Sequence, residues 1–241
     1  MLSAERLHKR YGAHTALHGL DLTVRPGEVY ALLGPNGAGK TTTINCFLGF
    51  VRPDGGRALV DGRDPALDPQ GARQALAYIP EQVNLYGWFS GRENLAYFAE
   101  LGGHRYRKAE LGGFLTEAGL EADAHDRPVS GYSKGMRQKV GIAIALAKDA
   151  RALLLDEPTS GLDPRASHEF SELLRRLSAR KVSILMATHD IFRALDVANR
   201  IGIMVGGRLI EEMDAGGLSA AGLEARYLNA TLAAAPAEAA P

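Results

Sequence analysis

A glycine-rich segment constrains the fold of this chain more than any other feature. It follows the apolar run Val29–Leu33 and precedes a helical pattern over 40–48. The pattern G-x-x-x-x-G-K-[ST] between a buried strand and a helix is typical of a phosphate-binding loop. Its residues are Gly34, Pro35, Asn36, Gly37, Ala38, Gly39, Lys40 and Thr41, with Thr42 next. The sequence therefore predicts an α/β core in which a parallel strand delivers this loop.

Each residue type in the loop has a chemical reason. Glycines let backbone N–H groups converge on phosphate oxygens without a Cβ in the way. The helix that follows points its positive end at the anion. In such a loop Lys40 reaches the β- and γ-phosphates and the Thr41 hydroxyl is a ligand of Mg²⁺. We therefore expect a nucleoside triphosphate with Mg²⁺ as the ligand.

A pair of acids belongs with this loop. The apolar run Ala152–Leu155 ends in Asp156 and Glu157, at the strand end where open α/β sheets bind ligands. Asp156 is predicted to hold Mg²⁺, and Glu157 to act as general base or orienter of the attacking water. The alternative is that these acids merely cap a helix that begins near Pro164.

The remaining sequence supports a mainly parallel sheet with helices between strands. Further buried runs lie at 182–187 and 201–205, and Gly206-Gly207 predicts a hairpin. Three helical patterns over 91–101, 107–119 and 134–148 form a predicted helical subdomain, about 84–150, inserted in a single domain over 1–215. Residues 216–241 form a C-terminal extension, which the Ala/Pro-rich composition predicts to be disordered from about 231.

Composition excludes several classes of protein. The 241 residues include 28 Lys+Arg and 28 Asp+Glu, so the chain has no net positive charge that would favour binding to nucleic acid. The single cysteine, Cys46, forms no intramolecular disulfide. No run approaches the roughly 18 apolar residues of a spanning helix. The sequence alone predicts a cytoplasmic protein.

The segment Ser130–Lys139, just before the acidic strand, separates this chain from other phosphate-loop proteins. It reads SGYSKGMRQK and resembles the signature motif of ATP-binding cassette (ABC) ATPases. The resemblance extends from Tyr11 to about residue 215. It implies the ABC ATPase fold, with an antiparallel β portion and an inserted helical subdomain, and ATP hydrolysis with Mg²⁺.

The resemblance also assigns roles at matching positions. It implies that Tyr11 stacks on adenine, that Asp163 of the 160–163 segment belongs to the D-loop, and that His189 contacts the γ-phosphate. Ser133 and Gly135 fit the signature, whereas Lys134 and Met136 stand where Gly and Gln are commoner. This signature form resembles ATPases paired with ABC-2-type permeases, mostly exporters.

The Q-loop position is open between two residues. Ungapped alignment back from 93–95 puts Glu81 at the glutamine position of the family, with Gln82 next to it. Either side chain could reach the metal and the attacking water.

The resemblance further implies partners. One copy of the signature and one phosphate loop predict a head-to-tail dimer, with itself or a related ATPase, closed by two ATP molecules. A separate membrane permease would hold the chain at the inner face of the membrane, with Tyr86, Trp88 and Phe89 as a candidate dock. The alternative for these aromatic residues is ordinary core packing. The alternatives are a soluble ABC ATPase that acts on nucleic acid or the ribosome, and a module that binds ATP without hydrolysing it.

Overall fold

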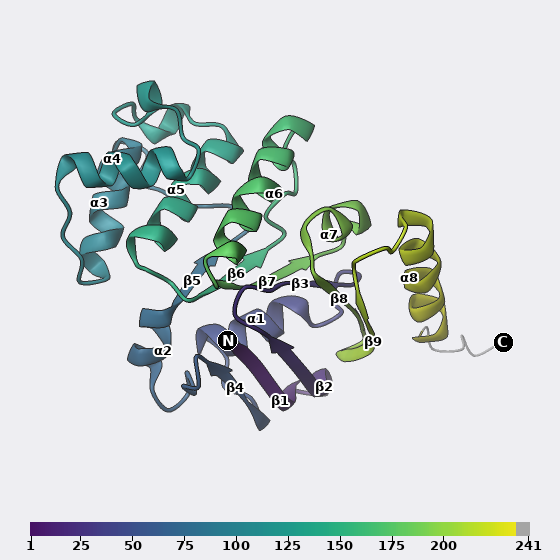
Figure 1. Ribbon diagram of the computed structural model, residues 1–241. Coiled ribbons are helices and arrows are strands. Elements are labelled where there is room, and N and C mark those ends of the chain that lie inside the picture. The colour runs from purple at the N-terminus through teal and green to yellow at the C-terminus, as the bar shows by residue number, and fades with distance from the viewer. Residues whose placement is uncertain (235–241) are drawn as a thin grey trace.

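The computed structural model describes residues 1–234, and its centre is a six-stranded sheet (Figure 1). The strand order is β5-β6-β7-β3-β8-β9, and only β9 runs antiparallel to its neighbour. The predicted hairpin at Gly206-Gly207 is confirmed, since it joins β8 to β9. The strands are β3 (Val29–Leu33), β5 (Leu76–Ile79), β6 (Ala152–Asp156), β7 (Ser183–Thr188), β8 (Arg200–Val205) and β9 (Arg208–Asp214).

Both faces of this sheet are covered, which explains the unbroken apolar runs. In β3, Ala31 and Leu33 pack in one hydrophobic core while Tyr30 and Leu32 pack in the other. Successive side chains of a strand point to opposite faces, so a strand buried on both sides must be apolar throughout.

One face carries a second, antiparallel sheet, the helix that follows the phosphate loop and a short helix over 69–75. The order in this sheet is β2-β1-β4, and β1 pairs antiparallel with both neighbours. Phe47 and Ile44 of the first of these helices lie in the core between the two sheets. The elements are β1 (Leu2–Tyr11), β2 (His14–Val24), β4 (Gly55–Val60) and α1 (Lys40–Leu48).

Helices cover the opposite face, with α3, α4 and α5 grouped at one end (Figure 1). The helical patterns predicted over 91–101, 107–119 and 134–148 are all confirmed, with ends within two residues. The helices are α2 (Pro69–Ala75), α3 (Gly91–Leu101), α4 (Lys108–Glu117), α5 (Lys134–Ala147), α6 (Pro164–Ala179), α7 (Ile191–Val197) and α8 (Ala220–Ala234), with the 3-10 turns η1 (Ala122–Ala124) and η2 (Val129–Gly131).

The helical segment shares its core with the sheet. Leu95, Leu115 and Val140 belong to the same apolar cluster as Leu153 and Ile184. The helices α3–α5 therefore pack against the same sheet, and this helical segment does not have a separate hydrophobic core.

The prediction that disorder begins at about residue 231 is wrong. Helix α8 continues to Ala234, so residues 231–234 are helical, and 235–241 lie outside the described residues. Leu223 and Ala230 are buried in the main core, against which α8 packs through α7 and β8. Alanine has the highest helix propensity, so an Ala-rich composition favours a helix once one face is packed.

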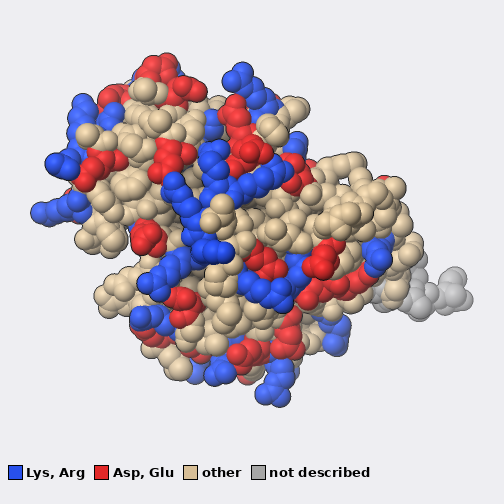
Figure 2. Space-filling model, in the orientation of Figure 1, with Lys and Arg blue, Asp and Glu red and all other residues tan. Residues whose placement is uncertain are grey.

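Basic and acidic side chains are interspersed over the face shown in Figure 2. Within residues 1–234, no helix combines the length and the apolar character that crossing a bilayer requires.

Candidate functional site

The phosphate loop leaves the carboxyl end of β3 in a conformation that needs glycine. Gly37 and Gly39 have φ of 81° and 105°, in the left-handed region. A Cβ on Gly39 would lie 2.7 Å from the carbonyl oxygen of Ala16, and one on Gly34 would lie 2.2 Å from that of Met204. The loop is thus packed against two other strands, and its shape depends on these glycines.

Helix α1 presents its amino end to the loop without a side-chain cap. Gly39 is the N-cap residue, so no hydroxyl or carboxylate occupies the first N–H groups of the helix. Lys40 is 5% exposed, and its Nζ donates to the carbonyl oxygens of Gly34 (2.6 Å) and Pro35 (3.2 Å). Burial lowers the pKa of Lys40, while the charges of Glu157 and Asp156 oppose that shift. The amino end of α1 can therefore receive an anion.

A cavity of about 380 Å³ surrounds this helix end. It gathers eight of the nine predicted residues of the phosphate loop, all but Gly34, and both acids of the β6 strand end. The lining residues are Tyr11, His14, Ala16, Pro35, Asn36, Gly37, Ala38, Gly39, Lys40, Thr41, Thr42, Glu81, Asp156 and Glu157. Tyr11, at the end of β1, is 46% exposed, and Lys9 Nζ lies 5.4 Å from the centre of its ring.

Asp156 and Thr41, which both line the cavity, contact each other. The Thr41 hydroxyl donates to Asp156 Oδ2 at 3.1 Å. Burial is the main cause that raises the pKa of Asp156, and the Thr41 hydrogen bond opposes it. Within residues 1–234 no group of three His, Cys, Asp or Glu side chains could hold a metal alone. One carboxylate and one hydroxyl fit Mg²⁺, which keeps waters and takes substrate phosphate oxygens as its other ligands.

Glu157 is held between a cation and a histidine. Its Oε1 lies 3.8 Å from Lys40 Nζ and 2.8 Å from His189 Nδ1, which must donate because a carboxylate only accepts. The Thr188 hydroxyl donates to Oε2 at 3.3 Å. The backbone of Glu157 is left-handed, with φ of 47°, and this conformation carries strain in a non-glycine residue. β6 and β7 thus bring together Glu157 and His189, which are far apart in the sequence.

The helix-capping alternative for the two acids is wrong. Asp163 is the N-cap of α6, and its Oδ1 accepts the N–H of Ala166 at 2.9 Å. Asp156 and Glu157 instead face the cavity. Asp163 itself does not line the cavity of its own chain.

The structure separates the two Q-loop candidates. Glu81 lines the cavity, whereas Gln82 lines a different recess with Tyr132, Lys134 and Arg137. Ser133 and Gly135, at the start of α5, are also absent from the lining of the cavity. Ser133 is exposed and accepts the N–H of Met136 as the N-cap of α5.

Three residues near the site were not predicted. His14 and Ala16 line the cavity because the β1–β2 hairpin pairs Tyr11 with His14. Thr188 supports Glu157 and accepts the N–H of Asp190. For Thr188, the only signal in the sequence was its position directly before His189. No local pattern in the sequence indicated the hairpin register that brings His14 and Ala16 to the cavity.

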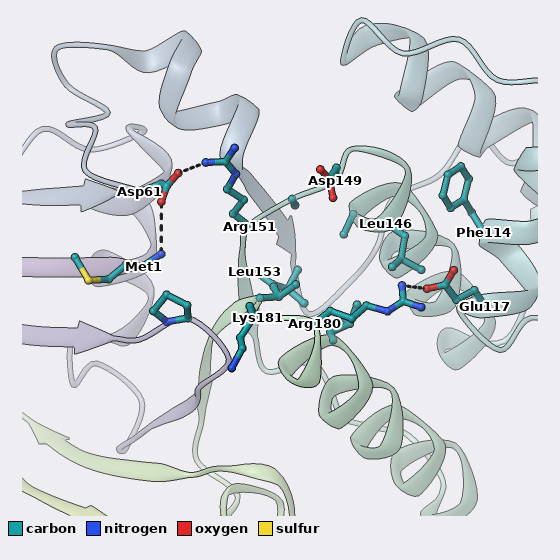
Figure 3. Close-up of a pocket in the computed structure, with 15 residues that line it drawn as sticks. Met1, Asp61, Phe114, Glu117, Leu146, Asp149, Arg151, Leu153, Arg180 and Lys181 are labelled. Carbon is teal, nitrogen blue, oxygen red and sulfur yellow. Dashed lines mark hydrogen bonds and ion pairs between the residues drawn. The ribbon is translucent and has the colours of Figure 1, made fainter.

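A second cavity, of about 460 Å³, lies at the amino ends of β3, β6 and β7 (Figure 3). Arg151 pairs there with Asp61 at 2.7 Å, and Arg180 pairs with Glu117. These charges already have partners, and open α/β sheets bind ligands at the opposite strand ends. The phosphate-loop cavity is therefore the candidate site.

The aromatic segment Tyr86–Phe89 is exposed and firmly anchored. Trp88 is 95% exposed. The fully buried Asn94 accepts the Tyr86 N–H at 2.8 Å and donates to the carbonyl oxygens of Tyr86 and Ser90 at 3.1 and 3.0 Å. This segment is also bonded to the stretch before Ser133, since the N–H groups of 129 and 130 donate to the carbonyls of 89 and 87.

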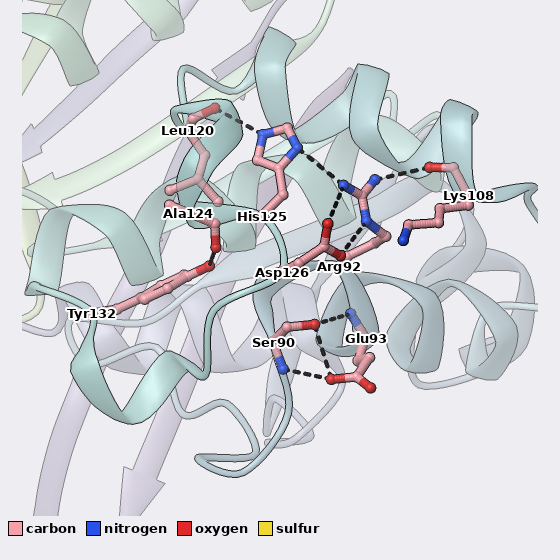
Figure 4. A network of polar contacts seen from close by, with 9 residues as sticks. All are labelled: Ser90, Arg92, Glu93, Lys108, Leu120, Ala124, His125, Asp126 and Tyr132. Carbon is pink, nitrogen blue, oxygen red and sulfur yellow. Dashed lines mark hydrogen bonds and ion pairs between the residues drawn. The ribbon is translucent and has the colours of Figure 1, made fainter.

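A polar network fixes the helices around that stretch (Figure 4). Ser90 and Glu93 form a capping box at the start of α3. Arg92 pairs with Asp126 at 2.8 Å, and the buried His125 contacts the Leu120 carbonyl at 2.9 Å. The aromatic segment, α3 and the residues before the signature are therefore one hydrogen-bonded unit.

Comparisons with known proteins identify relatives of this chain. The ABC transporter family profile matches residues 17–160. The daunorubicin resistance ATP-binding protein DrrA2 of Streptomyces coeruleorubidus is 41% identical over 89% of this chain and 67% of that protein. The Nod factor export ATP-binding protein I of Burkholderia orbicola is 40% identical over 86% of this chain and 68% of that protein. The chain thus spans about two thirds of the length of these relatives.

Solved structures give the same result. An ATP-binding subunit of an ABC transporter matches with a TM-score of 0.82 and 30% identity over 95% of this chain and 99% of that one. A dimeric bacterial ABC transporter cassette matches with a TM-score of 0.79 and 25% identity over 90% of this chain and 100% of that one.

Proposed function

The chain belongs to the ABC transporter ATP-binding family, and from this premise we propose that it hydrolyses ATP to drive a separate ABC-2-type permease. The observation that carries the proposal is the placement of Glu157 between Lys40 and His189, beside Asp156 and Thr41. This arrangement supplies a base, an electrophilic cation and metal-binding oxygens at one helix end.

In the proposed reaction, the N–H groups and Lys40 bind the phosphates of ATP and orient the γ-phosphoryl group. Glu157 accepts a proton from the attacking water, and His189, which donates to Glu157 through Nδ1, keeps that carboxylate in place. The ring of Tyr11 stacks on the adenine.

Thr41 and Asp156 would hold Mg²⁺, whose chemistry is to neutralise charge on the phosphate oxygens. Both side chains already point at one place, since their oxygens are 3.1 Å apart. Glu81, which lines the same cavity, would reach the metal and the attacking water.

Two copies are needed to complete each site. Ser133 and Gly135 are outside the cavity of their own chain, and Ser133 is exposed at the amino end of α5. We infer that they cover the γ-phosphate bound by a second copy, with Asp163 in the same interface. The dimeric cassette among the structural relatives supports this arrangement.

The permease is proposed to dock on the aromatic segment Tyr86–Phe89. The exposed rings have no partner within residues 1–234 that covers them fully, and exposed aromatic groups are common in interfaces. The names of the export and resistance relatives support export as the direction. The chain would then lie in the cytoplasm against the inner face of the membrane.

The test is an ATPase assay on the purified chain beside Lys40→Ala. We expect Mg²⁺-dependent phosphate release by the native chain and loss of at least about a hundredfold in the variant. A native chain that binds ATP but releases no phosphate, alone or with the permease, would indicate a regulatory module. Recovery of ribosomes or nucleic acid instead of a membrane protein in a co-purification would favour the other alternative.

A further inference from the structure

Two residues that depart from the family pattern contact each other. Glu81 stands at the glutamine position of the Q-loop, and Lys134 stands at a glycine position of the signature. Lys134 Nζ lies 3.7 Å from Glu81 Oε1, and the Ser160 hydroxyl donates to the same oxygen at 3.0 Å. The segment after β5, the start of α5 and the turn after β6 therefore meet at one carboxylate.

The contact solves an electrostatic problem of this cavity. Glu81 is the third carboxylate to line it, after Asp156 and Glu157, and like charges repel. Thr41 donates to Asp156, and Lys40 and His189 face Glu157. Within the described chain, Lys134 is the cation that the structure pairs with the remaining acid.

The position of the cation adds to this effect. Lys134 is the first residue of α5, so Glu81 also lies near the positive end of a 14-residue helix. The Glu81 side chain is 51% exposed and that of Lys134 is 29% exposed, so the pair is solvated and moderate in strength. A moderate pair can set the orientation of a loop side chain without making the loop rigid.

We propose that Lys134 is a positioning residue that keeps Glu81 directed into the ATP cavity of the same chain. This inference rests on the proposed function, because it assigns Lys134 a role in that reaction through Glu81. A glutamine at position 81 carries no charge and would not need the cation. The effect of Lys134 should therefore depend on which residue occupies position 81.

The experiment is a double-mutant cycle with Lys134→Met, Glu81→Gln and the double variant. Lys139→Met is the matched control, since Lys139 is on the same helix and pairs with Glu169 at 2.8 Å. Steady-state ATPase assays give kcat and KM. Hydrogen exchange of residues 80–85 in the nucleotide-free chain reports the contact without any turnover.

We expect Lys134→Met to lower kcat roughly two- to fivefold with little change in KM, as for an exposed pair. Exchange at 80–85 should rise in that variant and stay unchanged in Lys139→Met, and Lys134→Arg should restore both. In the Glu81→Gln background, Lys134→Met should have no further effect on kcat.

Lys134 does not act through Glu81 if its substitution lowers kcat by the same factor in both backgrounds, or if exchange at 80–85 is unchanged. A native chain without ATPase activity would defeat the proposed function instead. In that case the exchange measurement still decides whether Lys134 holds Glu81.

Discussion

Glu157→Gln tests the centre of the proposed reaction. The amide has the shape of the carboxylate, and its oxygen can still accept from His189 Nδ1, now 2.8 Å from Oε1. It cannot accept a proton from water. Gln and Glu have similar backbone preferences, so we expect the variant to keep the left-handed conformation at position 157.

Two changes accompany the substitution. The partly buried contact between Glu157 and Lys40, 3.8 Å long, loses its charge, but it exists before the reaction as well as during it, so most of that loss does not enter kcat. Loss of a general base lowers kcat by about 10²–10⁴-fold, which is about 2.7–5.4 kcal/mol at 1.36 kcal/mol per decade. Lys40 keeps its bonds to the carbonyls of Gly34 and Pro35, so ATP binding should change little.

The assay combines single-turnover hydrolysis with light scattering. We expect Glu157→Gln to bind ATP with near-native affinity, to hydrolyse it at least about a hundredfold more slowly, and to accumulate as a dimer. Glu100→Gln, on the surface of α3, is the control. A kcat within about fivefold of the native value would refute the role of Glu157 as base.

Two further predictions concern other parts of the molecule. Burial raises the pKa of the Asp156 carboxyl in the folded chain above its ordinary value of 3.8. The folded chain therefore loses stability as the pH rises from 3.8 through the raised pKa, and the full cost of the buried charge is present at pH 7. Asp156→Asn should therefore raise the free energy of unfolding at pH 7 by about 0.5–1 kcal/mol, and this gain should shrink as the pH falls toward 3.8. The same substitution should lower ATPase activity roughly a hundredfold or more. Urea titrations that show no gain in stability at pH 7 would contradict this prediction. Trp88 is the single tryptophan and is 95% exposed, so binding of the cognate permease should shift its emission to shorter wavelength and reduce its quenching by acrylamide, and unchanged emission in the complex would remove the proposed dock.

The sequence by itself determined the local elements that carry strong signals. Helix bounds at α1 and α3 and the strand β3 follow from glycine positions, N-caps such as Ser90 and unbroken apolar runs, all of which act within a few residues. The phosphate loop and the acids at the carboxyl end of β6 were predictable for the same reason.

Tertiary structure decided which distant residues meet. Glu157 reaches His189 because β6 and β7 are adjacent and parallel, and no local pattern encodes that pairing. The choice between Glu81 and Gln82 is equally non-local, since Glu81 lines the cavity and contacts Ser160 and Lys134, whereas Gln82 lines a different recess. The helix α8 shows the same limit: its Ala-rich composition permits either coil or helix, and burial of Leu223 in the shared core selects the helix.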